Sequence, residues 1–397
     1  MEIISDRVNR LSESATIAMS RKARDLKSQG IDIISLSLGE PDFTTPDFIK
    51  DAGKEGIDKN FSKYMPVNGY QDLREAISNK FKRDNGIDYS TEQIVVSTGA
   101  KQSIANVVLS LINPGDEVVV PAPYWVSYAE IIKMAEGIPV FIDTSIKNDF
   151  KVSPLELQDA ITSKTKMMIY SSPCNPSGSV YSKEELRSLA DVLINYPSIT
   201  VLSDEIYEHI NFTGNYFSIG AFPDIYNQVV TINGVSKSFA MTGWRLGYIG
   251  APLHIAQACT KIQGQFTSGT SSISQRAAIA AVSADPSVIY KMRDAFLSRR
   301  DFILEELSKI KGININKPQG AFYVFPDISA FFNKSYGDFK VTNSDQLAMY
   351  ILQTAKVAVV TGNAFGSPNC IRISYASSME KLKDAMDRIA IALNNLN

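Results

Sequence analysis

A lysine and an arginine eight residues apart have the spacing to do chemistry together. Lys237 follows an apolar run that ends near Ile232, in a turn rich in serine and glycine, and Arg245 lies between two glycines. A lysine amine buried beside a second cation loses basicity and becomes nucleophilic, and a guanidinium binds a phosphate through two hydrogen bonds. Each residue alone is also typical of a solvated loop. Together they predict a lysine that forms a Schiff base and an arginine that holds a cofactor phosphate.

An acid and a tyrosine follow another apolar run. Asp204 ends the strand-like segment 200–203, and Tyr207 comes three residues later. A cofactor with a pyridinium ring needs a carboxylate to keep the proton on its ring nitrogen, and the tyrosine hydroxyl suits the ring's phenolic oxygen. An acid at the end of a strand is, by itself, as typical of a helix cap.

Three more segments after apolar runs fit the same cofactor. Gly99, Ala100 and Lys101 open a helical pattern, where free backbone amides bind phosphate. The amide of Asn175 suits a cofactor oxygen, and Trp125 offers a flat face for stacking. A plain turn at Asn175 and core packing of Trp125 are the alternatives. The specific signal is the order in which all these features follow successive strands.

The elements that position these residues alternate between strand-like and helical patterns. Near-continuous apolar strands with helices between them predict an α/β fold with a mostly parallel sheet covered on both faces, in which ligands bind at the carboxyl ends of the strands. Ser182 with Glu185, and Ser377 with Glu380, predict capping boxes that start two helices. The strands are expected at 93–97, 117–121, 166–170, 200–203 and 229–232.

The pattern changes after about residue 285, where a long helical segment, short strand-like pieces and a final helix follow. We therefore expect a large domain over residues 44–285 that binds the cofactor. A smaller α+β domain would combine the N-terminal segment 1–43 with the C-terminal part 286–397.

Composition excludes several classes of function. The 397 residues carry a formal net charge of −2, which predicts no attraction to nucleic acid or membranes. Three cysteines without a CxxC pair indicate neither a disulfide framework nor a zinc site, and no metal is expected. With only two histidines, acid–base chemistry falls on Lys, Tyr, Asp or Glu. The polar start of the chain lacks the core of a signal peptide, so we expect a cytoplasmic protein.

The sequence resembles the class I, fold-type I aminotransferases that depend on pyridoxal 5'-phosphate, and within them the aspartate aminotransferase branch. The likeness runs almost end to end, on the segments described above. It implies that Lys237 forms the internal aldimine, that Asp204 holds the pyridinium, and that Tyr207 and Asn175 bond the ring oxygen. It also implies phosphate contacts from Arg245 with the Gly99–Lys101 turn, and stacking by Trp125.

Further segments resemble the family's substrate-binding parts. The likeness implies that the Gly39 backbone lies against the substrate, with Trp125 and Asn175 beside it, and that Arg372 binds the α-carboxylate. Thr16 and Lys101 resemble positions that meet a side-chain carboxylate. Tyr64 matches a tyrosine that reaches the phosphate of a neighbouring subunit, which implies a homodimer with shared active sites. The loop 361–370 departs from the family by lacking a proline before its first glycine and by its shortness.

The resemblance implies a ping-pong transfer of an amino group between an amino acid, first of all L-aspartate, and 2-oxoglutarate. Lys237 would also carry the Cα proton. Aromatic amino acids or prephenate are alternative substrates, and a carbon–sulfur lyase is an alternative reaction at the same cofactor. A non-enzymatic alternative, the effector-binding module of a regulator, needs a nucleic-acid-binding region, for which we see no room before Ser14.

Overall fold

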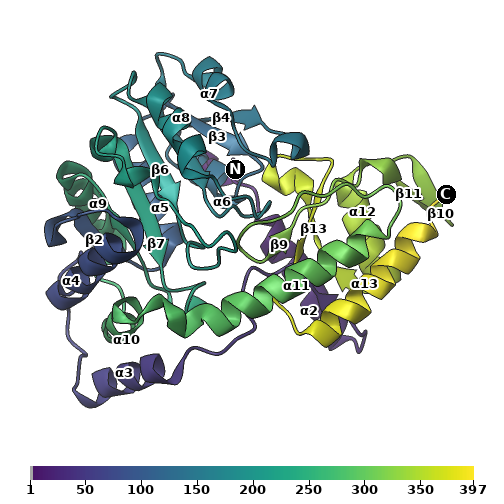
Figure 1. Cartoon of the computed structure of the whole chain (residues 1–397), viewed down its shortest axis with the longest axis horizontal. Helices are drawn as coiled ribbons and strands as arrows, with labels where there is room; N and C mark the ends of the chain where they lie inside the picture. Colours follow the sequence, from purple (N-terminus) through teal and green to yellow (C-terminus); the bar gives the residue numbers. More distant parts are fainter. Residues whose placement is uncertain (1–2) are drawn as a thin grey trace.

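Seven strands form one sheet in the middle of the chain (Figure 1). They lie in the order β2, β8, β7, β6, β5, β3, β4, and every neighbouring pair is parallel except the two pairs that β8 makes. The computed structural model describes residues 3–397. The predicted α/β fold with a mostly parallel sheet is confirmed. Its strands are β2 (Ile94–Ser97), β3 (Glu117–Ala122), β4 (Ile138–Asp143), β5 (Thr165–Ser171), β6 (Thr200–Asp204), β7 (Val229–Gly234) and β8 (Gly247–Gly250).

Helices cover both faces of this sheet because alternate side chains of each strand point to opposite faces. Val118 and Val120 of β3 pack in one apolar core with residues of α5, α6 and α9, whereas Val119 packs in a second core with residues of α7 and α8. The helices of these two layers are α5 (Ala100–Leu111), α6 (Ser127–Met134), α7 (Pro154–Ala160), α8 (Lys183–Leu193) and α9 (Leu253–Phe266).

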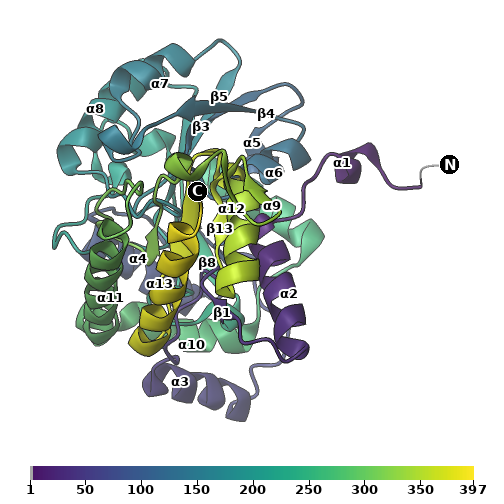
Figure 2. The ribbon, with the colours of Figure 1, turned by 90° about the vertical axis from the view of Figure 1, so that its right-hand side faces the viewer.

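The C-terminal part builds its own layer beside the sheet, with α11 and α13 next to each other (Figures 1 and 2). Three short strands form an antiparallel sheet in the order β13, β14, β9. These elements are α11 (Tyr290–Ser308), β9 (Tyr323–Val324), β10 (Lys334–Tyr336), β11 (Phe339–Val341), α12 (Ser344–Tyr350), β12 (Val357–Ala358), β13 (Val360–Thr361), β14 (Ile371–Ser374) and α13 (Met379–Asn394).

The N-terminal segment joins the C-terminal part by backbone hydrogen bonds. Strand β1 (Ile34–Ser35) pairs in parallel with β12, and the Ser374 amide donates to the Leu36 carbonyl. Figure 2 shows the first helix, α1, on an arm that extends outward. The domain boundaries near 43 and 285 stay a prediction, and residues 1 and 2 of the predicted N-terminal segment lie outside the described residues. The other helices are α1 (Asp6–Asn9), α2 (Ala15–Ser28), α3 (Asp47–Asp58), α4 (Gln71–Lys80) and α10 (Ser272–Ser283).

One of the two predicted capping boxes is confirmed and the other is wrong. Ser182 and Glu185 exchange side-chain and backbone hydrogen bonds at the start of α8. Helix α13 instead begins after Ser378, whose hydroxyl accepts from the Lys381 amide, so Ser377 lies one residue outside the cap. Adjacent serines at 377 and 378 make the register ambiguous in the sequence alone. Among residues 3–397, no helix is both long and apolar enough to cross a membrane.

Candidate active site

A cavity of about 240 Å³ lies where β5, β6 and β7 end. The sequence predicts a ligand site at this edge, the carboxyl ends of the parallel strands. It brings together residues from the N-terminal segment, the central sheet and the C-terminal part. Gly99 and Tyr64 are the two predicted site residues that do not line it. The predicted residues that line it are Thr16, Gly39, Ala100, Lys101, Trp125, Asn175, Asp204, Tyr207, Lys237, Arg245 and Arg372.

Lys237 presents its amine to the cavity from the turn after β7. Its Nζ donates to the carbonyl oxygen of Gly39 at 2.5 Å. Burial is the main reason that the pKa of Lys237 falls to about 8, and the cations Arg372 and Arg245 act in the same direction. A large fraction of this amine is therefore neutral near pH 8, which is the form that attacks a carbonyl or accepts a proton.

Asp204 ends β6 and is almost fully buried. The hydroxyl of Tyr128 donates to its Oδ2 at 2.6 Å, and the Ile206 amide donates to its Oδ1 at 3.3 Å. Burial raises the pKa of Asp204 to about 6 even though both hydrogen bonds and the charge of Lys237 oppose the rise. A cationic partner in the cavity would favour the carboxylate form, because an opposite charge lowers the pKa of an acid.

The cavity has an excess of positive charge. Lys101, Lys237, Arg245 and Arg372 line it, and Asp204 is the one carboxylate among its described lining residues. Within the described part of the chain, none of the four cations has a carboxylate oxygen within 4.0 Å. This charge pattern suits ligands with several negative charges.

Arg372 is the most deeply buried of these four cations, with only 1% of the residue exposed. Its Nη1 donates to Asn175 Oδ1 at 2.9 Å and its Nη2 to the Ser37 carbonyl at 2.5 Å. Its Nε is buried without a hydrogen-bond partner among the described residues. A buried charge left unpaired is costly, so this guanidinium is prepared for an anion that enters the cavity.

Arg245, which lines the cavity, meets Gly99, which does not. The Arg245 side chain turns toward the start of α5, where a Cβ added at Gly99 would lie 2.5 Å from its Nη2. Gly99 also has a φ of +83°, a region that glycine adopts without strain. The first amides of α5 have no intrahelical acceptor, so this helix start and Arg245 offer neighbouring donors of the kind that suit an anion.

Lys101, Trp125 and Thr16 also line the cavity. The Lys101 ammonium is 5.0 Å from the centre of the Trp125 ring, and Thr16 lies in the first turn of α2. The predicted Tyr64 is elsewhere: it is 98% exposed and does not line the cavity of its own chain. Its predicted contact with a second subunit stays a prediction.

Sequence reasoning missed two tyrosines of the cavity wall. Tyr128 lies in the first turn of α6, three residues after Trp125, and the two rings meet edge to face with centres 5.5 Å apart. Tyr323 lies in an apolar run that reads as a core strand, and its hydroxyl is 2.7 Å from that of Tyr207. A Cβ at Gly39 would lie 2.2 Å from the Tyr323 hydroxyl, which explains the glycine there by sterics.

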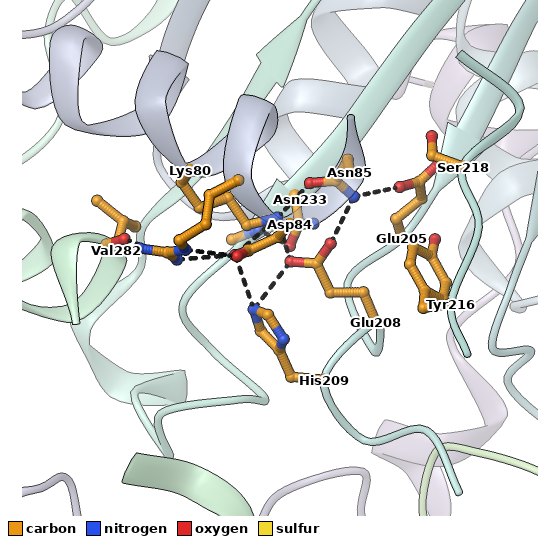
Figure 3. Close-up of polar contacts among 12 residues, drawn as sticks. Lys80, Asp84, Asn85, Glu205, Glu208, His209, Tyr216, Ser218, Asn233 and Val282 are labelled. Carbon is orange, nitrogen blue, oxygen red and sulfur yellow. Dashed lines mark hydrogen bonds and ion pairs between the residues drawn. The ribbon is translucent and has the colours of Figure 1, made fainter. Parts of the chain in front are cut away.

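A second polar cluster surrounds Glu205 and Glu208 of the same turn, 204–209 (Figure 3). The side-chain amide of Asn85 donates to Glu205 Oε2 at 3.1 Å and to Glu208 Oε2 at 2.7 Å. The Lys80 ammonium contacts Glu208 Oε1 and donates to Asn85 Oδ1 at 2.7 Å. This cluster, which we call the rear network, anchors the turn that carries Asp204 and Tyr207.

Asp84 and His209 extend the rear network, and with Glu208 they bring their ligand atoms close enough for a metal ion. His209 Nε2 lies 3.2 Å from Glu208 Oε1 and 3.4 Å from Asp84 Oδ2. The Lys80 ammonium also contacts Glu208 and lies 3.8 Å from Asp84. The Lys80 ammonium therefore already supplies a positive charge to these two carboxylates, in the place where a metal ion would supply one.

Comparison with known proteins matches this chain over nearly its whole length. Residues 31–389 match the family described as Aminotransferase class I and II. The aspartate/prephenate aminotransferase of Nitrosomonas europaea is 47% identical over 395 residues, which cover 98% of this chain and 100% of that protein. The bifunctional aspartate aminotransferase and glutamate/aspartate-prephenate aminotransferase of Petunia hybrida is 45% identical, over 98% of this chain and 82% of that protein.

Solved structures give the same result. The crystal structure of the aspartate aminotransferase from Rhizobium meliloti superposes with a TM-score of 0.96 at 38% identity, covering 99% of both chains. The aspartate aminotransferase from Thermus thermophilus with maleate superposes with a TM-score of 0.93 at 37% identity, covering 99% of this chain and 100% of that chain.

Proposed function

Since this chain belongs to the class I and II aminotransferases, we propose that it transfers an amino group between L-aspartate and 2-oxoglutarate with pyridoxal 5'-phosphate, in a ping-pong cycle. The family predicted from the sequence is the right one. One observation carries the proposal: a cavity with four unpaired cations around a single buried carboxylate, with Arg372 fully enclosed. This arrangement suits a phosphate at one end and carboxylates at the other.

The residues present fit pyridoxal phosphate. Gly99 leaves the space that Arg245 enters at the start of α5, which suits a phosphate, and Asp204 suits a ring nitrogen. Ser171 Oγ, in the cavity wall, is buried without a partner among the described residues and can bond a polar ligand. In this assignment Lys237 holds the aldehyde carbon, Tyr207 and Asn175 hold the ring oxygen, and Trp125 stacks on the ring.

Pyridoxal phosphate, when bound, supplies an aldehyde that takes up the amino group and a protonated ring that stores the electron pair left at Cα. The protein residues then have three tasks. Asp204 keeps a proton on the ring nitrogen. Lys237 Nζ, with its pKa lowered to about 8, takes the proton from Cα of the substrate and delivers it to the carbon that was the aldehyde of the cofactor. Arg372 and the backbone of Gly39 orient the α-carboxylate.

Lys101 and Thr16 support the choice of a substrate with a second carboxylate. They line the same cavity, and Lys101 has no carboxylate partner within the part of the chain that the structure describes. Aspartate and 2-oxoglutarate each carry a second carboxylate. The relatives from Nitrosomonas europaea and Petunia hybrida are both named for aspartate and prephenate, and prephenate is also a dicarboxylate. Prephenate is therefore our second candidate amino-group acceptor.

The exposed Tyr64 supports a homodimer in which this residue reaches the phosphate of the second subunit. Tyr64 is 98% exposed in a single copy, so its side chain is free to contact a second copy. Tyr64→Phe should then weaken cofactor retention in the dimer.

The decisive test is Lys237→Ala. Turnover of aspartate with 2-oxoglutarate should fall by several orders of magnitude, because both the covalent anchor and the proton carrier are lost. The absorbance of the covalently held cofactor should disappear as well. Lys291→Ala, a change at an exposed lysine of α11, is the matched control and should keep both. An alanine variant at 237 with full turnover would refute the proposal.

A second experiment separates the substrates. Lys101→Met should raise the KM for aspartate more than the KM for alanine, since only aspartate has the carboxylate that Lys101 would meet. Glutamate as donor with prephenate as acceptor, tested beside 2-oxoglutarate, decides whether prephenate is used. Equal effects of Lys101→Met on both donors would remove Lys101 from the substrate site.

A further inference from the structure

Tyr207 and Tyr323 form a hydroxyl pair between two parts of the fold. Their oxygens are 2.7 Å apart, and both side chains are buried. Tyr207 belongs to the turn after β6, whereas Tyr323 starts β9, which pairs with β14, the strand that carries Arg372. Within the described chain, neither hydroxyl makes another hydrogen bond. The Tyr323 hydroxyl therefore has Tyr207 as its one partner.

The surroundings hold Tyr323 in this position. The Arg372 guanidinium lies 4.5 Å from the centre of the Tyr323 ring, and the ring meets Tyr207 edge to face with centres 5.9 Å apart. Any side chain at residue 39 would clash with the Tyr323 hydroxyl. Three features thus fix the ring: the cation above it, the neighbouring tyrosine and the absence of a side chain at Gly39.

Proton counting gives the direction of this hydrogen bond. Each phenol has one proton to donate and lone pairs to accept with. This step rests on the proposed function, in which Tyr207 gives its proton to the ring oxygen of the cofactor. With that proton used, the Tyr207 oxygen can only accept from Tyr323. Burial also raises the pKa of both tyrosines, so each keeps its proton.

We propose that Tyr323 is a positioning residue that acts through Tyr207: it donates its proton to the Tyr207 oxygen and so directs the Tyr207 proton toward the cofactor. A hydrogen bond that a hydroxyl accepts also strengthens the one it donates. Tyr323 therefore makes Tyr207 a better donor to the ring oxygen. Because its ring also lies against Arg372, the same residue links the α-carboxylate site to the cofactor site.

The test uses Tyr323→Phe in the holoenzyme, which removes the hydroxyl and leaves the ring against Arg372. The readout is the pH midpoint at which the absorbance of the bound cofactor changes. Weaker donation from Tyr207 makes the ring oxygen more basic, so the midpoint should rise, on the order of half a pH unit. The kcat should fall by roughly threefold to tenfold, while the KM for aspartate stays within about twofold because Arg372 is unchanged.

Two controls isolate the action through Tyr207. Tyr375→Phe removes another buried hydroxyl close by, one that donates to the Ala321 carbonyl at 3.2 Å, and should leave the midpoint unchanged. In the double variant with Tyr207→Phe, the loss of the Tyr323 hydroxyl should add no further shift, since its route is gone. An additive shift, or no shift in Tyr323→Phe alone, would overturn the inference.

The outcome also separates this inference from the proposed function. If the wild-type protein does not take up pyridoxal phosphate, then the proposed function is wrong. If the wild-type protein and Tyr323→Phe both bind the cofactor with the same pH midpoint, the function stands and only the role of Tyr323 is lost.

Discussion

The two faces of the turn 204–209 differ in how completely their polar groups are satisfied. Asp204 and Tyr207 face the cavity with two hydrogen bonds and one, respectively, among the described residues, and both have capacity left for a ligand. Glu205 and Glu208 face the rear network, where hydroxyls, the Asn85 amide and the Lys80 ammonium surround them (Figure 3). One short turn thus combines a reactive face with a saturated one.

Glu205 and Glu208 of the rear network are both buried, but their pKa values shift in opposite directions. Burial raises the pKa of Glu205 to about 7, since its hydrogen-bond partners are neutral. Burial acts most strongly on Glu208 and in the same direction, but the charge and hydrogen bond of Lys80 together with the charge of His209 outweigh it, so the pKa of Glu208 lies below its ordinary value. The two cationic neighbours of Glu208, Lys80 and His209, therefore distinguish the two acids.

The largest effect is expected on the cavity face, from Asp204→Asn. A neutral amide cannot keep the ring nitrogen of the cofactor protonated, so kcat should fall by about a thousandfold. The free energy of unfolding of the cofactor-free protein should change little or rise, because burial already disfavours the carboxylate of Asp204. Steady-state kinetics and urea denaturation measure the two quantities. A loss of stability with normal kcat would reverse our distinction between the faces.

On the rear face, Glu208→Gln should act on stability. It leaves the Lys80 ammonium, only 3% exposed, without its closest carboxylate. Removing one partner of a buried ion pair costs about 3 kcal/mol of unfolding free energy. Urea denaturation at pH 7 is the measurement. The double variant with Lys80→Met should lose less than the sum of the two single losses, and strict additivity would show that the pair does not interact.

Glu205→Gln sharpens the comparison by pH. The pKa of Glu205 rises from 4.5 to about 7 on folding, so the folded state binds the proton more tightly than the unfolded state. The stabilising effect of this proton is present below pH 4.5 and is lost as the pH rises toward 7. A glutamine has no proton to lose, so the variant should be about 3 kcal/mol more stable than the wild type at pH 8 and nearly equal at pH 4.

Denaturation curves at the two pH values test this expectation. If the variant were the less stable protein at pH 8, the expectation would be wrong, because an ionised Glu205 would then stabilise the folded state. The kcat should stay near the wild-type value, in contrast to Asp204→Asn one residue earlier.

The sequence predicted the strand-end residues of the cavity well, because parallel strands bring their carboxyl ends to one edge. Lys237, Asp204 and Asn175 follow from that rule together with residue chemistry. Arg372 and Gly39 were placed only by resemblance, since no local pattern joins segments more than 300 residues apart. Tyr323 was missed because an aromatic residue in an apolar run is typical of core.

The rear network was beyond sequence reasoning for a related reason. Lys80 and Asn85 meet Glu205 and Glu208 across more than 100 residues of chain. Charged residues on a helix usually face solvent, so nothing local indicates that Lys80 is buried. Patterns report which face of an element is apolar, whereas ion pairs depend on how elements pack.

The pairing of β1 with β12 has a consequence for the order of events during synthesis. Ile34 leaves the ribosome about 320 residues before its partner Val357. At roughly 5–20 residues per second, the first strand waits between about 15 and 60 seconds for the second. The seven-stranded sheet is complete in sequence at Gly250, so it can assemble during that interval while the N-terminal segment is still unpaired. The pairing of β1 with β12 thus forms late in synthesis. If the ribosome stalled before Val357, β1 would stay unpaired and accessible to other chains.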